Sequence, residues 1–359
     1  MPKTERSNRS LKPGGTYGPR PKNKKRRSKK PVKKRVALNE VIVKLEHISK
    51  HYAIRSEKLF EAPRILKAVD GLSLEIRRGE TFGIVGESGC GKSTMGHMIV
   101  HLLEPTSGKV TYSAYPSGVP SSEMRAFREK YQIIFQDPYS SLNPKKRIGW
   151  LLTEPLNIHS IGTTPAVRRS IAERMLQEVG MDISCMEKYP NELSGGQRQR
   201  VAIAIAMITD PEFVVADEPV SALDVSIQAQ ILNLMKELQA ARGLTWLFIS
   251  HDLNVVHYIS DRIGVMYMGK LVEVGNVEAV YSEPMHPYTR ALLSSVPTID
   301  GPEKEDDVLE GEVKNTADRG SGCAFAPRCR YATEQCFRET PVLTKVGDRR
   351  VSCLRSGMI

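Results

Sequence analysis

The 359 residues are 40% hydrophobic and 26% charged, a composition typical of soluble globular proteins, and at about 150 residues per domain they predict two or three compact units. No apolar run approaches the roughly 18 residues that span a bilayer, and the first residues lack an apolar secretory signal. We therefore expect a protein that neither crosses a membrane nor is exported, with its cysteines in a reducing cytosol where structural disulfides are disfavoured.

The formal net charge of +11 is concentrated in one segment. Residues 1–36 hold 15 of the 52 Lys and Arg residues and one of the 41 acidic residues, so the rest of the chain holds 37 basic and 40 acidic groups. This basic tail has almost nothing apolar to bury, and we expect it to be disordered. A solvated arm is the simplest interpretation, and contact with anionic lipid or with RNA phosphates stays open beside it.

Strand patterns begin after about residue 36. Apolar residues alternate with more polar neighbours over residues 41–45 and 72–76, which predicts half-buried strands of an antiparallel layer. The apolar segment 80–86 predicts a buried strand that runs into GESGCGKST, residues 86–94, and then into an apolar helix. The order is strand, glycine loop, helix.

This glycine loop fits the P-loop pattern at every fixed position. Its glycines let successive backbone N–H groups point at phosphate oxygens, and a helix starting near Lys92 adds its positive dipole end. A glycine turn with an incidental lysine is the alternative, which the flanking strand and helix disfavour. Lys92 suits the β and γ phosphates, Ser93 suits Mg²⁺, and Cys90 is a small residue at a variable position. The predicted nucleotide-binding residues here are Gly86, Ser88, Gly89, Cys90, Gly91, Lys92, Ser93 and Thr94.

A second apolar segment, FVVADEP at 213–219, predicts a buried strand ending in two adjacent carboxylates. Asp217 at the strand end suits the Mg²⁺ shell, and Glu218 can then face a water in line with the γ-phosphate. Two acids after an apolar strand can also be a simple strand terminus. The functional interpretation of these two carboxylates therefore depends on the other motifs in the sequence.

The segment LSGGQRQR, residues 193–200, precedes an apolar helix predicted over 197–209. Ser194 is typical of an N-cap, Gly195 and Gly196 permit close backbone approach, and Gln197 opens a helix whose N-terminus faces an anion. The P-loop already binds one triphosphate. A second anion-binding helix end is therefore expected to cap the γ-phosphate bound by another subunit.

These three segments, in this order and spacing, resemble the ATP-binding cassette of ABC transporters over about residues 40–285. The resemblance implies an α/β fold: a P-loop NTPase with a RecA-like core, an antiparallel β layer and a helical lobe. We expect the basic tail over 1–36, the cassette over 37–285 with its lobe at about 137–193, and a Cys-containing C-terminal extension over 286–359.

The resemblance also implies roles for single residues. Tyr52 matches the aromatic that stacks on adenine, although a half-buried strand tyrosine is the alternative. Gln136 matches the Q-loop glutamine that senses the γ-phosphate and Mg²⁺, Asp224 lies in the D-loop, and His251 matches the switch histidine. The implied catalytic residues are Glu218, His251 and Gln136, and the implied Mg²⁺ ligands are Ser93, Gln136 and Asp217. Ser194, Gly195, Gly196 and Gln197 would bind the nucleotide of the partner cassette.

Two positions depart from the family pattern. Val220 stands where the family usually has Thr, and Ile205 stands where the signature helix often has Arg. Neither is expected to touch the phosphates, so ATPase activity should survive both.

The segment 286–297, HPYTRALLSSVP, together with QDPYSSLNP at 136–144, resembles the oligopeptide, dipeptide and nickel import branch, in the type of the second of two paired ATPases. This implies an ATP-hydrolysing subunit at the cytoplasmic face of the membrane, energising uptake of oligopeptides or dipeptides. The implied partners are two permease subunits, a second ATPase in a heterodimer, and an extracytoplasmic binding protein. The cargo would be selected by the permease and the binding protein, which are separate chains.

Four cysteines, Cys323, Cys329, Cys336 and Cys353, lie beyond an acidic linker at 300–313 and form no CxxC pair, which disfavours a zinc ribbon. Their arrangement resembles the extension of this branch, in which some members ligate a 4Fe-4S cluster. Buried or spare thiols are the alternative. The segment KNTADRGS and Arg330 depart from the branch, which affects how the extension docks rather than the thiols. Cys185 is expected to serve packing.

A cytosolic ABC-type ATPase that acts on ribosomes or nucleic acid is the alternative function. It would explain the basic tail, but such translation proteins usually join two cassettes, and chromosome-organising ATPases split theirs with coiled coils. Here Lys92 and Asp217 are 125 residues apart without heptads between them.

Overall fold

The computed structural model of the protein describes residues 40–54, 64–295 and 321–358. The chain separates into two units, Met1–Val36 and Ala37–Ile359, and all described residues belong to the second. The predictions for the basic tail over 1–36 and for the acidic linker at 300–313 lie outside the described residues.

The larger of the two sheets in the described residues has eight strands and lies at the centre of the fold. Its strand order is β10-β11-β9-β8-β3-β7-β6-β5. Strand β3 pairs in parallel with both β7 and β8, whereas β8 pairs antiparallel with β9. The strands are β3 (Thr81–Val85), β5 (Tyr131–Ile134), β6 (Phe213–Asp217), β7 (Thr245–Ile249), β8 (Arg262–Tyr267), β9 (Lys270–Asn276), β10 (Thr344–Val346) and β11 (Arg349–Val351).

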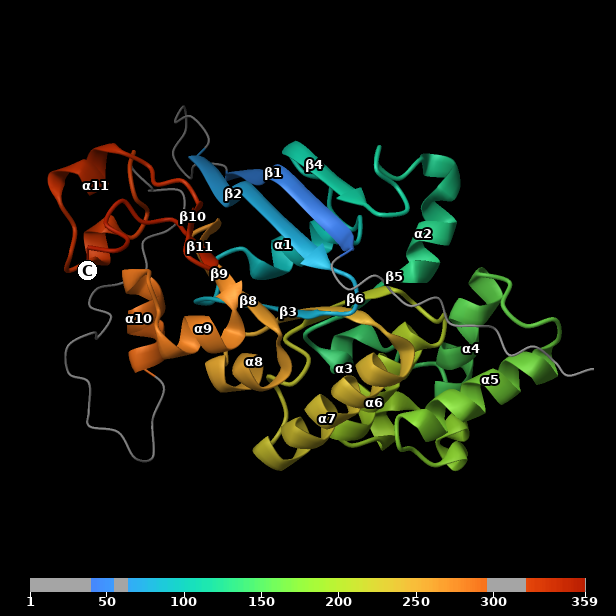
Figure 1. The fold of residues 1–359 in the computed structure, drawn as a ribbon. Helices are drawn as coiled ribbons and strands as arrows, with labels where there is room; N and C mark the ends of the chain where they lie inside the picture. Colours follow the sequence, from blue (N-terminus) through green and yellow to red (C-terminus); the bar gives the residue numbers. More distant parts are fainter. Residues whose placement is uncertain (1–39, 55–63, 296–320, 359) are drawn as a thin grey trace, which may run out of the picture. The chain divides into compact units, whose positions relative to one another are not determined.

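The predicted antiparallel layer is a three-stranded sheet of order β2-β1-β4. Its strands are longer than the alternating segments of the sequence: β1 covers Val41–Ile54, β2 covers Arg64–Arg77, and β4 covers Ser107–Tyr112. Helix α1 (Lys92–Ile99) lies between this sheet and the central sheet (Figure 1). Its Met95, Met98 and Ile99 belong to one apolar cluster with residues of both sheets.

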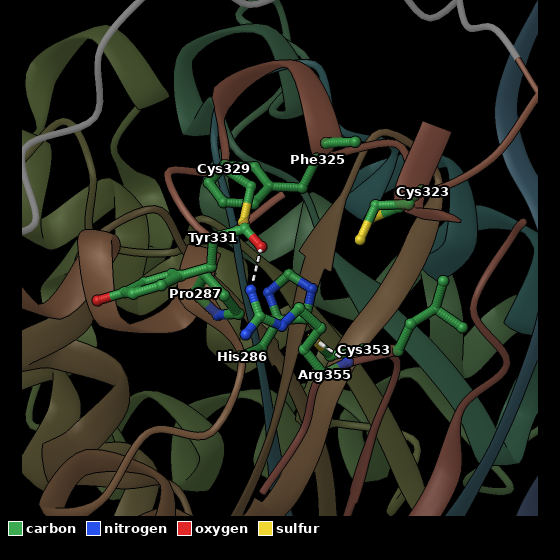
Figure 2. Close-up of a pocket in the computed structure, with 11 residues that line it drawn as sticks. His286, Pro287, Cys323, Phe325, Cys329, Tyr331, Cys353 and Arg355 are labelled. Atoms are coloured by element: carbon green, nitrogen blue, oxygen red, sulfur yellow. Dashed lines mark hydrogen bonds between the residues drawn. The ribbon is translucent and has the colours of Figure 1, made fainter. Parts of the chain in front are cut away.

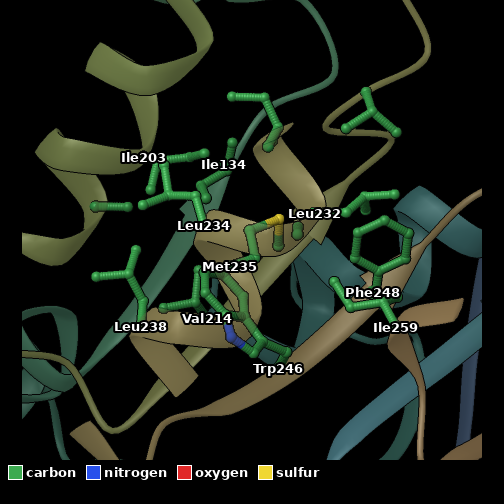
Figure 3. Packing of buried hydrophobic residues seen from close by; sticks show 14 of the residues in the cluster. Ile134, Ile203, Val214, Leu232, Leu234, Met235, Leu238, Trp246, Phe248 and Ile259 are labelled. Atoms are coloured by element: carbon green, nitrogen blue, oxygen red, sulfur yellow. The ribbon is translucent and has the colours of Figure 1, made fainter. Parts of the chain in front are cut away.

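The alternation of side chains along β7 separates two apolar clusters. Leu247 and Ile249 belong to the cluster with α1, whereas Trp246 and Phe248 belong to the cluster on the opposite face. Trp246 is fully buried and lies beside the side chains of α7, Val225–Arg242 (Figure 3). Burying a large apolar side chain contributes about 1.5–3 kcal/mol, so both faces of this strand fix its place in the sheet.

Helices cover the Trp246 face of the sheet (Figure 1). The segment predicted as a helical lobe, about 137–193, contains α3, α4 and α5 and the 3-10 turns Ile183–Glu187 and Pro190–Glu192. Thr164 caps α5 with its side chain, and Pro165 occupies the first turn, as expected where a helix starts. The remaining bounds are α2 (Met124–Lys130), α3 (Pro138–Ser141), α4 (Ile148–Ile158), α5 (Pro165–Glu178), α6 (Gly195–Met207), α7 (Val225–Arg242), α8 (Leu253–Ile259), α9 (Val277–Ser282), α10 (Pro287–Ser294) and α11 (Glu334–Arg338).

The C-terminal hairpin β10-β11 continues the central sheet. Arg350 and Val351 of β11 pair with Val274 and Glu273 of β9. In the part of the chain that the structure describes, no helix has the length and apolar character to traverse a lipid bilayer.

Candidate nucleotide site

The glycine loop joins β3 to α1, as the sequence predicts, and α1 begins at Lys92. The Lys92 ammonium donates to the carbonyl oxygens of Gly86 at 2.8 Å and Glu87 at 3.0 Å. Gly91 has φ +104°, and a Cβ there would lie 2.1 Å from the Ala68 carbonyl oxygen. Glycine is therefore required at this position, because other residues meet both the strain and the clash.

The P-loop and the second buried strand meet at one hydrogen bond. The Ser93 hydroxyl donates to Asp217 Oδ1 at 2.9 Å, at the point where β6 ends. Asp217 is 3% exposed, and burial raises the pKa of its carboxyl above the usual range. A hydroxyl and a carboxylate side by side are hard oxygen donors, which fit Mg²⁺.

Three further predicted residues converge beside this pair. Gln136 Nε2 donates to Glu218 Oε2 at 2.9 Å, and His251 Nδ1 lies 3.2 Å from the same oxygen. Glu218 has φ +46°, an uncommon conformation for a non-glycine residue, and its N–H donates to the Ile249 carbonyl at 2.9 Å. The backbone thus holds the carboxylate at the ends of β6 and β7, where parallel strands of a sheet commonly place ligand sites.

The signature segment is built as a capped helix start. Ser194 Oγ accepts from Gln197 N–H at 3.3 Å, while Gln197 Oε1 accepts from Ser194 N–H at 3.0 Å. Helix α6 begins at Gly195, two residues earlier than predicted, because this reciprocal capping box places both glycines inside the first turn. A Cβ on Gly196 would lie 2.6 Å from Ile227, which explains the small residue.

Not all predicted site residues are brought together. No hydrogen bond or ion pair joins Ser194 or Gln197 to the P-loop within the described ranges. Tyr52 lies on β1 opposite Leu66, 36% exposed, with the Lys50 ammonium 5.6 Å from its ring centroid. Asp224 precedes α7 and makes no capping hydrogen bond with its side chain.

The two positions that depart from the family pattern are packing positions. Val220 is 3% exposed in the core, and Ile205 packs against the same cluster. Cys185 is also buried in this cluster, as expected.

A cavity in the C-terminal extension is lined by all four predicted cysteines, which are free thiols (Figure 2). Burial raises the pKa of Cys329 to about 11, and the neighbouring thiols add to the rise. Cys323 N–H donates to the Cys336 carbonyl at 2.8 Å, which ties two of the cysteine-bearing segments together. His286 and Arg355 also line this cavity. Among the described residues, however, no group of three or more His, Cys, Asp or Glu side chains is arranged to hold a metal ion.

The structure also reveals a contact that sequence reasoning missed. Arg328 of the extension forms an ion pair with Glu87 of the P-loop, 241 residues earlier in the chain. The residue types carry no local signal for this pairing. Only the fold brings the two residues together.

Comparison with known proteins places the chain in a family. A profile described as ABC transporter matches residues 69–221, and one described as oligopeptide/dipeptide transporter, C-terminal region, matches residues 272–336. A putative oligopeptide transport ATP-binding protein YkfD of Bacillus subtilis is 49% identical over 296 residues, covering 81% of this chain and 90% of the relative. The chain belongs to the ATP-binding proteins of oligopeptide and dipeptide ABC transporters.

Other members of this ABC family agree. The dipeptide transport ATP-binding protein DppF of Haemophilus influenzae is 45% identical over 85% of this chain and 93% of its own length. The solved dimeric, post-hydrolysis ATP-binding cassette MJ0796, bound to ADP and Pi, aligns with TM-score 0.58 and 31% identity over 66% of this chain and 99% of its own. The predicted family, the ABC cassette fold and the ATPase activity are confirmed. The alternative of a ribosome- or nucleic-acid-acting ATPase is not favoured by these relatives.

Proposed function

We propose that this ABC ATPase hydrolyses ATP to drive import of oligopeptides or dipeptides through a separate permease. The observation that carries the proposal is the convergence of Gln136 and His251 on one oxygen of Glu218, beside the Ser93–Asp217 pair. This arrangement joins a P-loop to a carboxylate held in a fixed orientation. It has the parts that phosphoryl transfer to water needs.

In the proposed mechanism, Lys92 binds the β and γ phosphates and Glu218 orients and deprotonates the attacking water. His251 and Gln136 hold the Glu218 carboxylate, so its orientation requires no rearrangement at the moment of reaction. Mg²⁺, held by Ser93, Asp217 and Gln136, would neutralise phosphate charge. Tyr52 would stack on adenine.

The signature segment supports a site shared between two cassettes. Ser194 and Gln197 are exposed and lie on a helix end whose N–H groups favour an anion, yet no contact joins them to the P-loop within the described residues. We infer that Ser194–Gln197 complete the site of a partner ATPase together with Asp224, whose neighbour Leu223 lies against Gly195. The dimeric state of MJ0796 supports this inference by similarity.

The substitution Glu218→Gln in the assembled complex tests this mechanism. We expect ATP turnover to fall at least about 10²-fold, because the amide cannot accept the proton of the water. ATP should still bind, and the paired cassettes should stay closed on it. Turnover at the wild-type rate would overturn the proposal, as would the failure of ATP to bring two cassettes together.

The names of the relatives support a membrane-bound importer with peptides as cargo. We propose two permease subunits, a second ATPase in a heterodimer and an extracytoplasmic binding protein as partners, with this chain peripheral at the cytoplasmic face. Co-expression with the permease pair should move the protein to the membrane fraction, and proteoliposomes should accumulate labelled dipeptide when ATP is supplied. Recovery with ribosomes instead would contradict this assignment.

We also propose how the chain is divided into domains. We propose the cassette over 37–285 with its lobe at about 137–193, and the extension over 286–359. For the basic tail, residues 1–36, we propose contact with a polyanion. Binding of the protein to RNA and to vesicles with and without anionic lipid tests this proposal. Binding that persists at high salt would contradict it, since phosphate contacts weaken steeply with salt.

We also propose that Cys323, Cys329, Cys336 and Cys353 hold a 4Fe-4S cluster. The specific observation in favour is that all four thiols line one cavity. A 4Fe-4S cluster is ligated by four thiolates, which is the number of cysteines that line this cavity. The raised thiol pKa values mean that cluster binding would release protons.

Iron and acid-labile sulfide in anaerobically purified protein test this proposal. We expect about four of each per chain, with loss in Cys329→Ser and retention in the control Cys185→Ser. A colourless protein that contains neither element would overturn it.

A further inference from the structure

The ion pair between Arg328 and Glu87 joins the extension directly to the P-loop. Arg328 Nη1 donates to both oxygens of the Glu87 carboxylate at 3.0 and 3.1 Å, and its Nη2 donates to Oε1 at 3.1 Å. The two side chains are 8% and 21% exposed. The bidentate geometry of this pair fixes the relative position of the two groups. Removing either partner would leave an uncompensated charge in a largely buried place.

Glu87 is held on its backbone as well. Its N–H donates to Tyr288 Oη at 3.0 Å, and its carbonyl oxygen accepts from the Lys92 ammonium at 3.0 Å. Tyr288 is fully buried on α10, with its ring packed against Tyr267 and Phe325. The side chain and the N–H of one P-loop residue are thus anchored in the C-terminal part of the chain, while its carbonyl holds Lys92.

This geometry has an electrostatic consequence for the nucleotide. Glu87 is a carboxylate in the loop that binds a highly negative triphosphate, and Arg328 is the cation that offsets it. Without Arg328, the unpaired carboxylate would repel the phosphates and attract the Lys92 ammonium away from them. The Glu87 carbonyl oxygen, which accepts from the Lys92 ammonium, would also be held less firmly.

We propose that Arg328 is a positioning residue for ATP binding, acting through Glu87 on the P-loop and Lys92. The inference rests on the proposed role of the P-loop in binding ATP. The C-terminal extension would then support ATP binding in the same chain, in addition to holding the cluster proposed for its cysteine-lined cavity. The expected signature is a weaker affinity for ATP with little change in the maximal rate.

The test uses the full chain, with binding of a fluorescent ATP analogue, and the assembled complex, with KM for ATP and kcat. Arg328→Gln should raise the Kd for ATP about tenfold, while kcat at saturating ATP changes less than about twofold. Arg328→Lys keeps the charge but not the bidentate geometry, so its Kd should lie between those of the wild type and Arg328→Gln. Arg338→Gln is the matched control, since Arg338 lies on the exposed face of the same extension with its side chain 75% exposed, and its Kd should equal the wild type.

A double variant, measured together with thermal unfolding, separates positioning from a merely structural role. Glu87→Gln removes the carboxylate that Arg328 neutralises, so Glu87→Gln/Arg328→Gln should bind ATP more tightly than Arg328→Gln alone. Thermal unfolding is measured beside the Kd, because removing the unpaired charge would also restore docking: if Arg328 only docks the extension, Arg328→Gln lowers the melting temperature and leaves the Kd for ATP at the wild-type value. The inference is overturned if Arg328→Gln binds ATP like the wild type, or if the double variant is as weak as Arg328→Gln.

Two comparisons keep the result decisive. If Arg328→Gln does not fold, Arg328→Lys and the double variant carry the same test. Lys92→Ala is measured in parallel: if ATP binding survives that change, the proposed role of the P-loop fails, which is a different outcome from failure of the Arg328 inference.

Discussion

His251 Nδ1 lies 3.2 Å from Glu218 Oε2, the same oxygen that accepts the hydrogen bond of Gln136. Glu218 and His251 follow neighbouring strands, β6 and β7, and Gln136 follows β5 at the sheet edge beside β6. Three consecutive strand ends therefore hold a single carboxylate. Its orientation depends on side chains from segments more than 80 residues apart in the chain.

The first prediction concerns this contact. His251→Ala should lower kcat by about 10²-fold, because the Glu218 carboxylate loses a partner that fixes its orientation. The Kd for ATP should change less than about twofold, since the P-loop is intact. Steady-state ATPase assays and nucleotide binding check both. His257→Ala, on the exposed face of α8 beside Glu278, is the control and should keep the wild-type rate; a wild-type rate for His251→Ala would contradict the assigned role.

The second prediction concerns the stability of the nucleotide-free protein. Because burial raises the folded-state pKa of Asp217 above its unfolded value of 3.8, the folded state binds the proton more tightly, and stability is lost as the pH rises through the folded pKa. At neutral pH the ionised carboxylate therefore costs stability. Asp217→Asn should raise the free energy of unfolding by about 1 kcal/mol without nucleotide, and should abolish the further stabilisation by Mg²⁺ and ATP.

Thermal unfolding with and without Mg²⁺ and ATP measures both effects. The control Asp210→Asn changes an exposed carboxylate and should leave both unchanged. Stabilisation of Asp217→Asn by Mg²⁺ and ATP to the wild-type extent would show that Asp217 does not hold the metal.

The third prediction separates the two half-sites. Ser194→Ala removes the N-cap of α6, which should cost about 0.5–2 kcal/mol of stability, and leaves ATP binding by the isolated chain unchanged. ATP-dependent pairing of cassettes should be lost, because the helix end proposed to bind the partner's nucleotide is disrupted. Sedimentation or light scattering of chains that also carry Glu218→Gln is the measurement. Weaker ATP binding by the isolated Ser194→Ala chain would place Ser194 in the site of its own subunit and refute the shared arrangement.

The fourth prediction concerns pH. Burial lowers the pKa of His101, whose ring packs edge-on against Phe127 at 5.1 Å. Below the unfolded value of 6.5 the unfolded state takes up the proton more readily, so stability present above that pH is lost as the pH falls toward the folded pKa. His101→Asn, which tolerates the left-handed backbone at φ +55°, should lose less stability between about pH 7.5 and about pH 5.5 than the wild type.

Urea denaturation at the two pH values checks this prediction. An equal loss of stability in His101→Asn and in the wild type would refute the assignment to His101.

The local parts of the site could be predicted from the sequence because short-range rules determine them. The P-loop requires glycines next to Lys92, a buried strand leads to Asp217, and Ser194 has the residue type and spacing of a capping box. Each of these depends on residues within about one helical turn or one strand of one another.

The remaining relationships depend on the tertiary fold. The pairing of Arg328 with Glu87 requires that the extension dock beside the P-loop, which no pattern near either residue encodes. Likewise, β11 is a strand of three residues that pairs with β9 about 75 residues earlier in the chain, and periodicity cannot identify so short a strand. The start of α6 at Gly195 was missed because glycine is a poor helix former, and here the capping box outweighs that propensity.

The β10-β11 hairpin also bears on the solubility of the chain before assembly. Strand β9 is buried from Leu271 to Gly275, and β11 covers its outer edge by pairing at Glu273 and Val274. An uncovered edge of such apolar character would offer unpaired N–H and C=O groups to other chains, which is how sheets recruit strands into aggregates. A chain that lost this hairpin would thus be prone to self-association by edge-to-edge pairing, even with every residue of the proposed nucleotide site in place.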